Sequence, residues 1–289
     1  MADKVAFVLS GGGSLGSVQV GMLRALIEID IKPDILIGTS VGALNAAYLA
    51  GHGATLDTVD SMEKTWLGLK TRDVFPFDPL RLSLATVGLA NSLCSNNSLR
   101  RIIKAHLTFK RIEDAPIPLH VVTTDLRSGK EVLLSKGDAV NAILASSAIP
   151  AIFPSIEFDG KTLIDGGVAD NAAISQAIDL GADLIYVLPT GYTCDLSEVP
   201  RTALASAVHA LTLLMEQRLI VDVEHYADRV DIRVMPPLCP LSVSSIDFRH
   251  TARLINDSYE ATSGWLKTED KRSSKPERVL ALHSHSGDR

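Results

Sequence analysis

The sequence has few cysteines, no long apolar run and no stripe of basic residues. Cys94, Cys194 and Cys239 are widely spaced and form no CxxC pattern. An odd number of scattered cysteines predicts free thiols in a reducing compartment. The longest apolar stretch, Ala203 to Met215, contains His209 and is too short to span a bilayer.

The net charge and the amino-terminal residues give further information on the class of protein. The net charge is −6 and no lysine and arginine cluster stands out, which argues against a nucleic-acid partner. Met1 to Lys4 leads directly into a short apolar run that ends in glycines, a pattern unlike a signal peptide. These features predict a soluble, cytoplasmic protein.

A hydrophobic content of 46% is enough to fill one large core. The chain has no internal repeat and no interdomain linker, so we expect a single domain over residues 1–266. Residues 267–289 are polar, mixed in charge and without periodicity, which predicts a flexible carboxy-terminal extension.

Apolar strand-like runs alternate with helical patterns along the chain. Strands are expected at 5–9, 34–37, 119–124, 131–134, 161–164, 184–188 and 230–234, and helices at 17–29, 41–51, 56–68, 98–107, 138–146, 172–180, 202–225 and 248–266. Because the strands are uninterrupted apolar runs, they indicate an α/β fold with a mostly parallel sheet covered by helices on both faces.

The most informative segment is Gly38-Thr39-Ser40-Val41-Gly42. It matches G-x-S-x-G between an apolar strand and a helical pattern, which is the context of a nucleophile elbow. On such a sharp turn, the positions two before and two after the serine are crowded and favour glycine. The Ser40 hydroxyl then projects outward, while the N–H of Val41 faces a developing oxyanion. The alternative is a glycine-flanked helix in which Ser40 is only the N-cap.

A second glycine motif, Gly11 to Gly16, lies between the first strand and the first helix. It fits the dinucleotide fingerprint G-x-G-x-x-G, but that interpretation requires an acidic residue at the end of the second strand, where Gly38 stands. Consecutive glycine N–H groups at a helix start also bind anions. Beside a serine nucleophile they would form an oxyanion hole, in which each donor contributes about 3 kcal/mol.

Ser40 needs a neighbouring base. The histidines are poorly placed for a triad, although His250, near a helix start, stays open. Asp165 is the better candidate, because it ends an apolar strand and is followed by Gly166 and Gly167, which allow close approach of another loop. Partial desolvation would raise its pKa and make it a stronger base. The alternative is a plain Asp-Gly turn.

Three further polar residues are expected to be structural. Asp125 follows a strand and is interpreted as a turn residue. Asp170 and Asn171 are expected to brace the Asp165 loop or to cap the next helix.

Together these motifs resemble the patatin-like phospholipase family over about residues 5–177. The glycine-rich loop matches 10–16, the elbow 38–42 and the aspartate motif 165–167, and the blocks at 124–129 and 145–154 look similar too. The resemblance implies a three-layer α/β/α fold with a mostly parallel central sheet, and a lipid acyl hydrolase that uses no metal or organic cofactor. It also implies a Ser-Asp dyad of Ser40 and Asp165, with an oxyanion hole made by the N–H groups of Gly12, Gly13 and Ser14.

One position departs from the family pattern. Bacterial members commonly carry arginine where this chain has Leu15, and a guanidinium would suit a phosphate head group. Acyl hydrolysis is therefore better supported than a preference for phospholipids over neutral esters. We expect a serine esterase or lipase acting on fatty acyl esters, with transient contact to a membrane surface. An acyltransferase, a Ser-His esterase and a non-catalytic nucleotide- or lipid-binding regulatory protein remain as alternatives.

Residues 73–97 are irregular in pattern and rich in leucine and phenylalanine. We expect part of this segment to line an acyl pocket or to form a mobile cover, the alternative being a helix packed on the core. Arg100, Arg101 and Lys104 follow it, and they face either anionic lipid or solvent.

Overall fold

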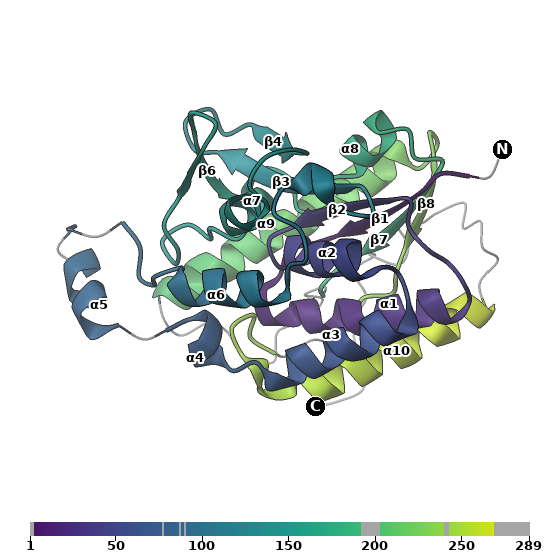
Figure 1. The fold of residues 1–289 in the computed structure, drawn as a ribbon, viewed down its shortest axis with the longest axis horizontal. Coiled ribbons are helices and arrows are strands. Elements are labelled where there is room, and N and C mark those ends of the chain that lie inside the picture. Colours follow the sequence, from purple (N-terminus) through teal and green to yellow (C-terminus); the bar gives the residue numbers. More distant parts are fainter. Residues whose placement is uncertain are drawn as a thin grey trace.

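The computed structural model describes residues 3–76, 78–86, 88–89, 91–191, 203–239 and 243–268. In these residues a central mixed sheet is flanked by helices on both faces (Figure 1). The strands are β1 (Val5–Leu9), β2 (Ile35–Thr39), β3 (Leu119–Asp125), β4 (Glu131–Leu134), β5 (Ile156–Phe158), β6 (Lys161–Asp165), β7 (Leu184–Leu188) and β8 (Asp231–Val234).

The helices are α1 (Ser17–Glu28), α2 (Val41–His52), α3 (Leu56–Gly68), α4 (Thr71–Val74), α5 (Pro79–Thr86), α6 (Asn97–His106), α7 (Ala139–Ser146), α8 (Ile174–Asp179), α9 (Ala203–Tyr226) and α10 (Thr251–Thr268). Four short 3-10 turns are η1 (Gly13–Gly16), η2 (Ile112–Asp114), η3 (Gly166–Val168) and η4 (Phe248–His250). The α/β/α layering expected from the alternating pattern is thereby confirmed.

The sheet follows the order β5-β6-β3-β2-β1-β7-β8, and β4 pairs with β3 as well. β3, β2, β1, β7 and β8 are parallel, whereas β4, β5 and β6 run antiparallel to their neighbours. The expected mostly parallel sheet is confirmed, and β3 and β4 pair as an antiparallel hairpin. β5 was not predicted, because a three-residue strand is too short to show a pattern.

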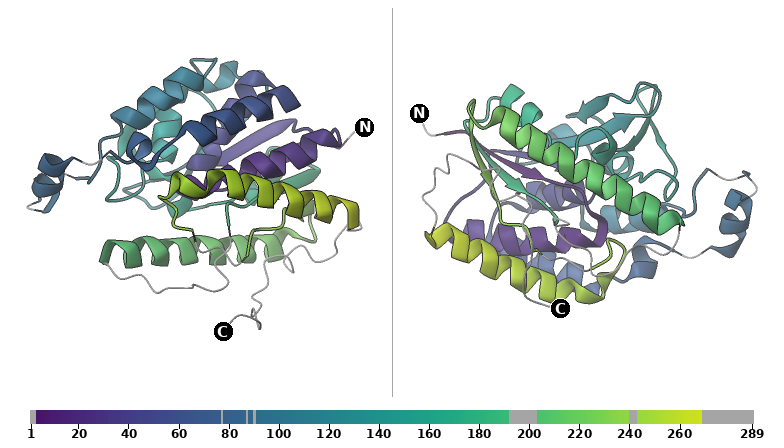
Figure 2. Two further views of the ribbon diagram at one scale, coloured as in Figure 1. Left: turned by 90° about the horizontal axis from the view of Figure 1, so that it is seen from below. Right: turned by 180° about the vertical axis from the view of Figure 1, so that it is seen from behind.

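Side chains of the central strands alternate between two apolar clusters. Phe7 and Leu9 of β1 belong to the cluster that includes residues of α1, α2 and α10, while Ala6 and Val8 belong to the cluster with α8 and α9. Figure 2 shows α9 crossing the sheet on the face opposite to α1 and α2. Both faces of the parallel strands are therefore buried, as their uninterrupted apolar composition predicts.

Two expectations concern features outside the core. Cys94 is a free thiol, but Cys239 is disulfide-bonded, so the prediction of free thiols is wrong for Cys239. Wide spacing along a chain does not prevent two cysteines from meeting after folding, which is why the sequence pattern misled. Cys194 and residues 269–289, most of the expected extension, lie outside the described residues. Among the helices that the structure describes, none combines the length and apolar character required to cross a membrane.

Candidate active site

Ser40 and Asp165 meet in a buried hydrogen bond at the end of β2. The Ser40 Oγ donates to Asp165 Oδ2 at 2.7 Å. The second carboxylate oxygen, Oδ1, accepts the N–H of Gly167 at 2.9 Å. The exposed fractions of Ser40 and Asp165 are only 5% and 4%. The serine hydroxyl thus points at a carboxylate that is itself held in place by the following turn.

The register of three strands explains this meeting. β2 pairs with Leu119–Val122 of β3, and β6 pairs with the next residues of β3, Thr123–Asp125. β4 pairs with residues of β3 that also pair with β2 or with β6, and it therefore occupies one side of β3. β2 and β6 must both lie along the other side of β3. They run toward each other along it, and their carboxyl ends meet. Ser40 follows the last residue of β2, and Asp165 is the last residue of β6.

The backbone at Ser40 has the strained geometry of a nucleophile elbow. Its φ is +54°, a rare value for a residue other than glycine. The Ser40 N–H donates to Ser146 Oγ at 2.8 Å, and that hydroxyl donates to the Val122 carbonyl at 2.6 Å. Ser146, at the end of α7, therefore links the strained residue to β3.

The two elbow glycines lie where no side chain fits. A Cβ on Gly42 would lie 2.1 Å from the carbonyl oxygen of Leu9, and one on Gly38 would lie 2.5 Å from the Ala43 Cα. In the Asp165 loop, a Cβ on Gly166 would lie 2.3 Å from the Val122 carbonyl oxygen. Glycine at these positions lets the loops approach the neighbouring backbone closely.

Burial changes the pKa of the Asp165 carboxylate. Desolvation raises the pKa of Asp165 from the ordinary 3.8 to about 6, while the hydrogen bonds from Ser40 and from the Gly167 N–H act in the opposite direction. A carboxylate with a pKa of about 6 is still mostly ionised at neutral pH, and it accepts a proton more readily than an exposed aspartate does.

The glycine-rich loop packs directly against the elbow. A Cβ on Gly11 would lie 3.0 Å from the Ser40 Cβ, and the Gly11 N–H donates to Asn171 Oδ1 at 2.8 Å. Asn171 lies in the loop after Asp165, and its hydrogen bond with Gly11 links that loop to the glycine-rich loop. In the described part of the chain, no acceptor contacts the N–H groups of Gly12 and Gly13, which leaves both available as donors.

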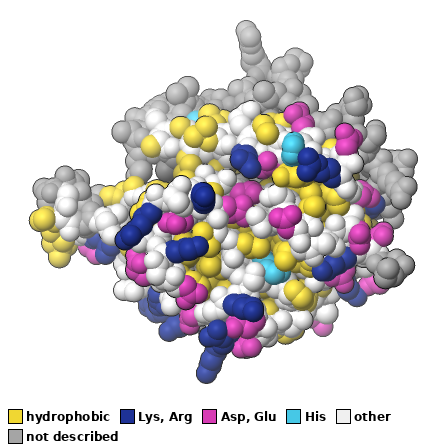
Figure 3. Space-filling view, turned by 90° about the horizontal axis from the view of Figure 1, so that it is seen from above, with side chains coloured by type: hydrophobic (Ala, Val, Ile, Leu, Met, Phe, Trp, Pro, Cys, Tyr) yellow, Lys and Arg dark blue, Asp and Glu magenta, His cyan; other side chains and the backbone are white. Residues whose placement is uncertain are grey.

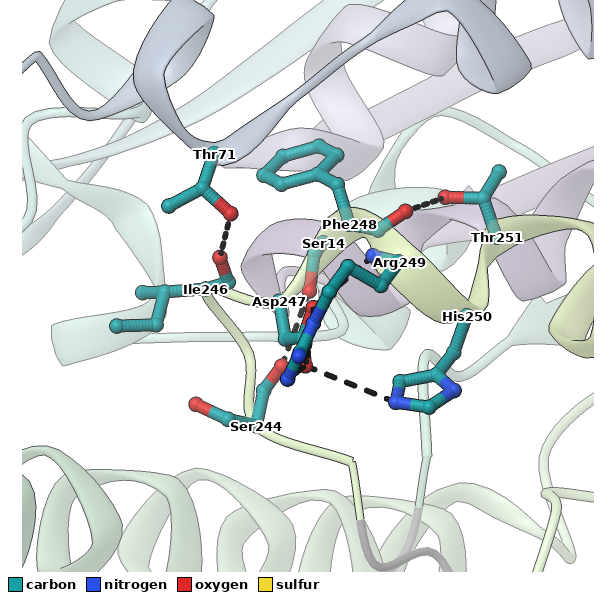
Figure 4. A network of polar contacts seen from close by, with 9 residues as sticks. All are labelled: Ser14, Thr71, Ser244, Ile246, Asp247, Phe248, Arg249, His250 and Thr251. Carbon is teal, nitrogen blue, oxygen red and sulfur yellow. Dashed lines mark hydrogen bonds and ion pairs between the residues drawn. The ribbon is translucent and has the colours of Figure 1, made fainter.

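Ser14 differs from these two glycines. Its N–H donates to the Ser245 carbonyl at 2.7 Å, and its hydroxyl contacts the Ser244 carbonyl at 3.1 Å. Figure 4 shows this segment, which is tied to α4 by a hydrogen bond from Thr71 to the Ile246 carbonyl at 2.9 Å. In this conformation the Ser14 N–H is occupied, so it could bind an oxyanion only after Ser245 moves.

The histidine that the sequence left open lies in the same segment. His250 is 3.6 Å from Asp247 and its side chain is directed toward that carboxylate (Figure 4). Among the described residues, no histidine forms a hydrogen bond with Ser40. The geometry therefore favours Asp165 over His250 as the partner of Ser40.

The remaining polar residues have structural contacts. Asp125 accepts hydrogen bonds from the Arg127 N–H and the Ser128 hydroxyl, which fits a turn residue. Asp170 accepts the N–H of Ala172 just before α8. Leu15 packs against the main apolar cluster.

An apolar pocket leads away from Ser40 and encloses about 910 Å³ of empty space, its open mouth included. Gly13 and Ser40 lie along its wall together with side chains from α2, α3, α6 and the chain after α7. The larger of these side chains are Leu44, Tyr48, Met62, Trp66, Phe75, Leu99, Ile103, His106, Phe153 and Phe248. A pocket with so apolar a lining suits an apolar chain.

Part of the segment 73–97 was expected to line a pocket, and two of its residues do so. Val74 and Phe75 line it, and the Phe75 ring stacks on Phe153 with the ring centroids 5.5 Å apart. Among the side chains of α5 that the structure describes, none belongs to the lining. Phe77 and Val87 lie outside the described residues.

A buried polar network below the glycine-rich loop escaped the sequence analysis. Asn45 donates to the Gly16 carbonyl and to Gln19 Oε1, and it accepts the Trp66 Nε1–H at 3.0 Å. Gln19 in turn donates to the Ser10 carbonyl. The network fixes η1 against α2 and α3. Within the described residues, no three His, Cys, Asp or Glu side chains gather as ligands for a metal ion.

The chain is similar in sequence to known proteins. The family model of patatin-like phospholipases matches residues 7–178. Lysophospholipase NTE1 of Pyricularia oryzae is 28% identical over 197 residues, and the patatin-like phospholipase domain-containing protein 7 of Rattus norvegicus is 30% identical over 191 residues. These matches cover 68% and 65% of this chain but only 12% and 14% of the two relatives.

Solved structures with a similar chain path include VipD from Legionella pneumophila and human GIVD cytosolic phospholipase A2 in complex with methyl gamma-linolenyl fluorophosphonate. VipD is 16% identical, with a TM-score of 0.47, and the match covers 93% of this chain and 67% of VipD. The human phospholipase is 13% identical, with a TM-score of 0.49, and the match covers 96% of this chain and 60% of the other.

Ser40 therefore stands on a sharp strand-to-helix turn of an α/β/α fold, hydrogen-bonded to buried Asp165 and next to a glycine-rich loop. With the family model matching more than half of its length, the chain belongs to the patatin-like phospholipase family.

Proposed function

We propose that this protein is a serine acyl hydrolase that cleaves fatty acyl esters with a Ser-Asp dyad. The observation that carries the proposal is the 2.7 Å hydrogen bond from Ser40 Oγ to Asp165 Oδ2 at the wall of an apolar pocket. The names of the relatives, lysophospholipase and patatin-like phospholipase, support a lipid ester as the substrate. We treat residues 1–266 as one catalytic domain.

The first half-reaction acylates the enzyme. Ser40 Oγ attacks the ester carbonyl carbon as its proton passes to Asp165 Oδ2. The N–H groups of Gly12 and Gly13 stabilise the oxyanion of the tetrahedral intermediate, and the N–H of Val41 at the start of α2 adds a third donor. When the intermediate collapses, the alcohol leaves with the proton from Asp165, and the acyl group remains on Ser40.

The second half-reaction returns the enzyme to its starting state. Asp165 accepts a proton from a water molecule that attacks the acyl carbonyl, and the same donors stabilise the second tetrahedral intermediate. Collapse releases the fatty acid and returns the proton to Ser40. Each step therefore uses Asp165 once as a base and once as an acid.

The pocket indicates which part of the substrate the site recognises. Its described lining contains no lysine or arginine, and the partly buried Leu15 packs against the main apolar cluster. The acyl chain would fill the apolar pocket, while the alcohol portion would lie outside it, at the surface where a membrane lipid presents its head group. Chain length is therefore expected to matter more than head-group charge.

The proposal is tested by the products formed from a panel of lysophospholipids, phospholipids, glycerides and short esters. Release of free fatty acid, lost in the Asp165→Asn variant with the fold intact, is the expected result. Transfer of the acyl group to an added lipid alcohol, with little free acid, would indicate an acyltransferase instead. Full activity in Asp165→Asn would overturn the dyad.

A further inference from the structure

The segment beside the pocket has a charge opposite to that of the rest of the chain. Residues 70–106 contain six lysines and arginines and two aspartates, a net charge of +4, whereas the whole chain has a net charge of −6. Arg81 is used within the segment, because its guanidinium donates to Ser92. In the part of the chain that the structure describes, Lys70, Arg72, Arg100, Arg101 and Lys104 form no ion pair.

The same segment carries exposed leucines on a projecting element. We call α5 with the following Gly88 and Leu89 the arm. Figures 1 and 2 show α5 standing away from the sheet and its helices in every view, and Figure 3 shows hydrophobic side chains at the far end of this projection. Leu80 is 70% exposed and Leu89 is 75% exposed. Both leucines therefore leave most of their apolar surface open to solvent.

Both ends of the arm are attached to the wall of the pocket. On the amino-terminal side, Phe75 stacks on Phe153, and both rings line the pocket. On the carboxy-terminal side, the Leu93 and Cys94 N–H groups donate to the carbonyls of Ala151 and Ile152, each at 2.8 Å. The arm is therefore tethered on both sides to residues in or next to the lining of the pocket.

α6 connects this apolar element to the positive charge. Its inner face lines the pocket with Leu99 and Ile103, while Arg101 and Lys104 on the same helix are exposed. α4, which carries Arg72, lies against α6. One side of the pocket is thus bordered by exposed cations and by the exposed leucines of the arm.

From this arrangement we propose that the arm and the outer face of α6 form a docking surface for an anionic lipid bilayer. Leu80 and Leu89 enter the boundary between head groups and acyl chains, and Arg101 and Lys104 contact the anionic head groups. This combination of apolar and basic side chains is the one that peripheral proteins use at membrane surfaces. Because residues 70–106 carry +4 within a whole-chain net charge of −6, the rest of the chain has a net charge of −10 and is repelled from the same surface, so docking is oriented.

The inference deepens the proposed function, on which it rests for the role of the pocket. Docking by this surface would place the pocket mouth against the bilayer, so that a single acyl chain passes from the membrane to Ser40 without crossing water. The binding itself does not depend on hydrolysis.

The test measures binding of the full chain carrying Ser40→Ala to vesicles of phosphatidylcholine alone and of phosphatidylcholine with phosphatidylglycerol. We expect binding to the anionic vesicles that weakens with salt. The pair Arg101→Gln and Lys104→Gln should lower the partition coefficient about thirtyfold, since each cation near an anionic surface contributes on the order of 1 kcal/mol and about 1.4 kcal/mol is tenfold. The pair Leu80→Ser and Leu89→Ser should lower it about tenfold.

A matched control removes two positive charges elsewhere, with Lys136→Gln and Lys267→Gln, both exposed. This control should bind as the parent does. Turnover of a water-soluble short ester by the same pairs in the protein with Ser40 intact should be unchanged, which shows that the variants are folded.

The proposal would be overturned by equal binding to neutral and anionic vesicles, or by an equal loss in the control pair and in the α6 pair. Binding only to an acidic protein, and to no vesicle, would also reject a bilayer as the partner. Failure of the proposed function is seen separately, as absence of soluble-ester turnover in the wild type while vesicle binding persists.

Discussion

Thr39 and Asp165 occupy successive positions along one edge of β3, with Thr39 paired to Val122 and Asp165 paired to Thr123. Because β2 and β6 run toward each other along this edge, the residue after Thr39 meets the last residue of β6. The two side chains of the proposed dyad are thus placed by backbone pairing rather than by long flexible loops. A dyad built in this way is preorganised before substrate binds.

The pH dependence of turnover follows from the pKa of Asp165. Burial raises that pKa to about 6, and the base is active only when ionised. The value of kcat/KM for a soluble ester should therefore rise with pH through about 6 and then stay level to mildly alkaline pH. Because the pKa of a carboxyl group changes little with temperature and that of an imidazole falls on warming, the profile should not shift between two temperatures. A marked shift would point to a histidine base instead.

The Asp165→Asn variant should have lower turnover and, at alkaline pH, a higher free energy of unfolding than the wild type. General base catalysis contributes about 10²- to 10⁴-fold, so turnover should fall by that range. The pKa of Asp165 is higher in the folded state than the ordinary 3.8. The contribution of Asp165 to the free energy of unfolding is therefore most favourable below pH 3.8, and it is lost as pH rises through about 6.

Above pH 6 the buried charge therefore costs folding free energy, on the order of 3 kcal/mol at one pKa unit per 1.4 kcal/mol. Urea unfolding at pH 8 should show the Asp165→Asn variant to be more stable than the wild type, and at pH 4 the difference should be small. A variant that is less stable at pH 8 would contradict the assigned burial cost.

Two adjacent serines test the support of the elbow. Ser146 Oγ accepts the Ser40 N–H and donates to Val122, whereas Ser147 Oγ is buried with no partner among the described residues. Ser146→Ala should lower the free energy of unfolding by about 1 to 3 kcal/mol, because it leaves two buried groups unpaired. It should also slow acylation of Ser40. Ser147→Ala should leave stability unchanged or slightly higher, and equal losses in both variants would argue against a specific role of Ser146.

Backbone contact at the elbow is tested by a pair of glycine substitutions. A Cβ at Gly42 would lie 2.1 Å from the Leu9 carbonyl oxygen, whereas a Cβ at Gly68, the last residue of α3, would meet nothing within 4 Å. Gly42→Ala should therefore destabilise the protein by about 3 kcal/mol or more, and Gly68→Ala should be neutral or stabilising. Thermal unfolding measures both, and similar melting temperatures would contradict the close packing of β1 on the elbow.

The sequence was most informative where the backbone restricts the residue type. Gly38 and Gly42 around Ser40, and the glycines after Asp165, are visible in the sequence because no other side chain fits at those contacts. The uninterrupted apolar strands likewise predicted the parallel part of the sheet. These features depend on local sterics and burial, which a single sequence displays directly.

Other features depend on contacts between residues that lie far apart in the sequence, and a single sequence does not reveal these contacts. Asp165 was selected because it ends an apolar strand, yet β6 is antiparallel to β3, and its end reaches Ser40 because it meets the end of β2. The contact of Ser14 with the Ser245 carbonyl could not be foreseen either, since any residue supplies a backbone acceptor. The network around Asn45 joins three helices, and polar residues at helical positions do not reveal which helix they will meet.

The most direct test of the dyad is the site of reaction with a fluorophosphonate, located by mass spectrometry of the intact protein and of its peptides. The account predicts one adduct on Ser40, no adduct in Ser40→Ala, and much slower labelling in Asp165→Asn. An adduct on another residue, or equal labelling of wild type and Ser40→Ala, would contradict it.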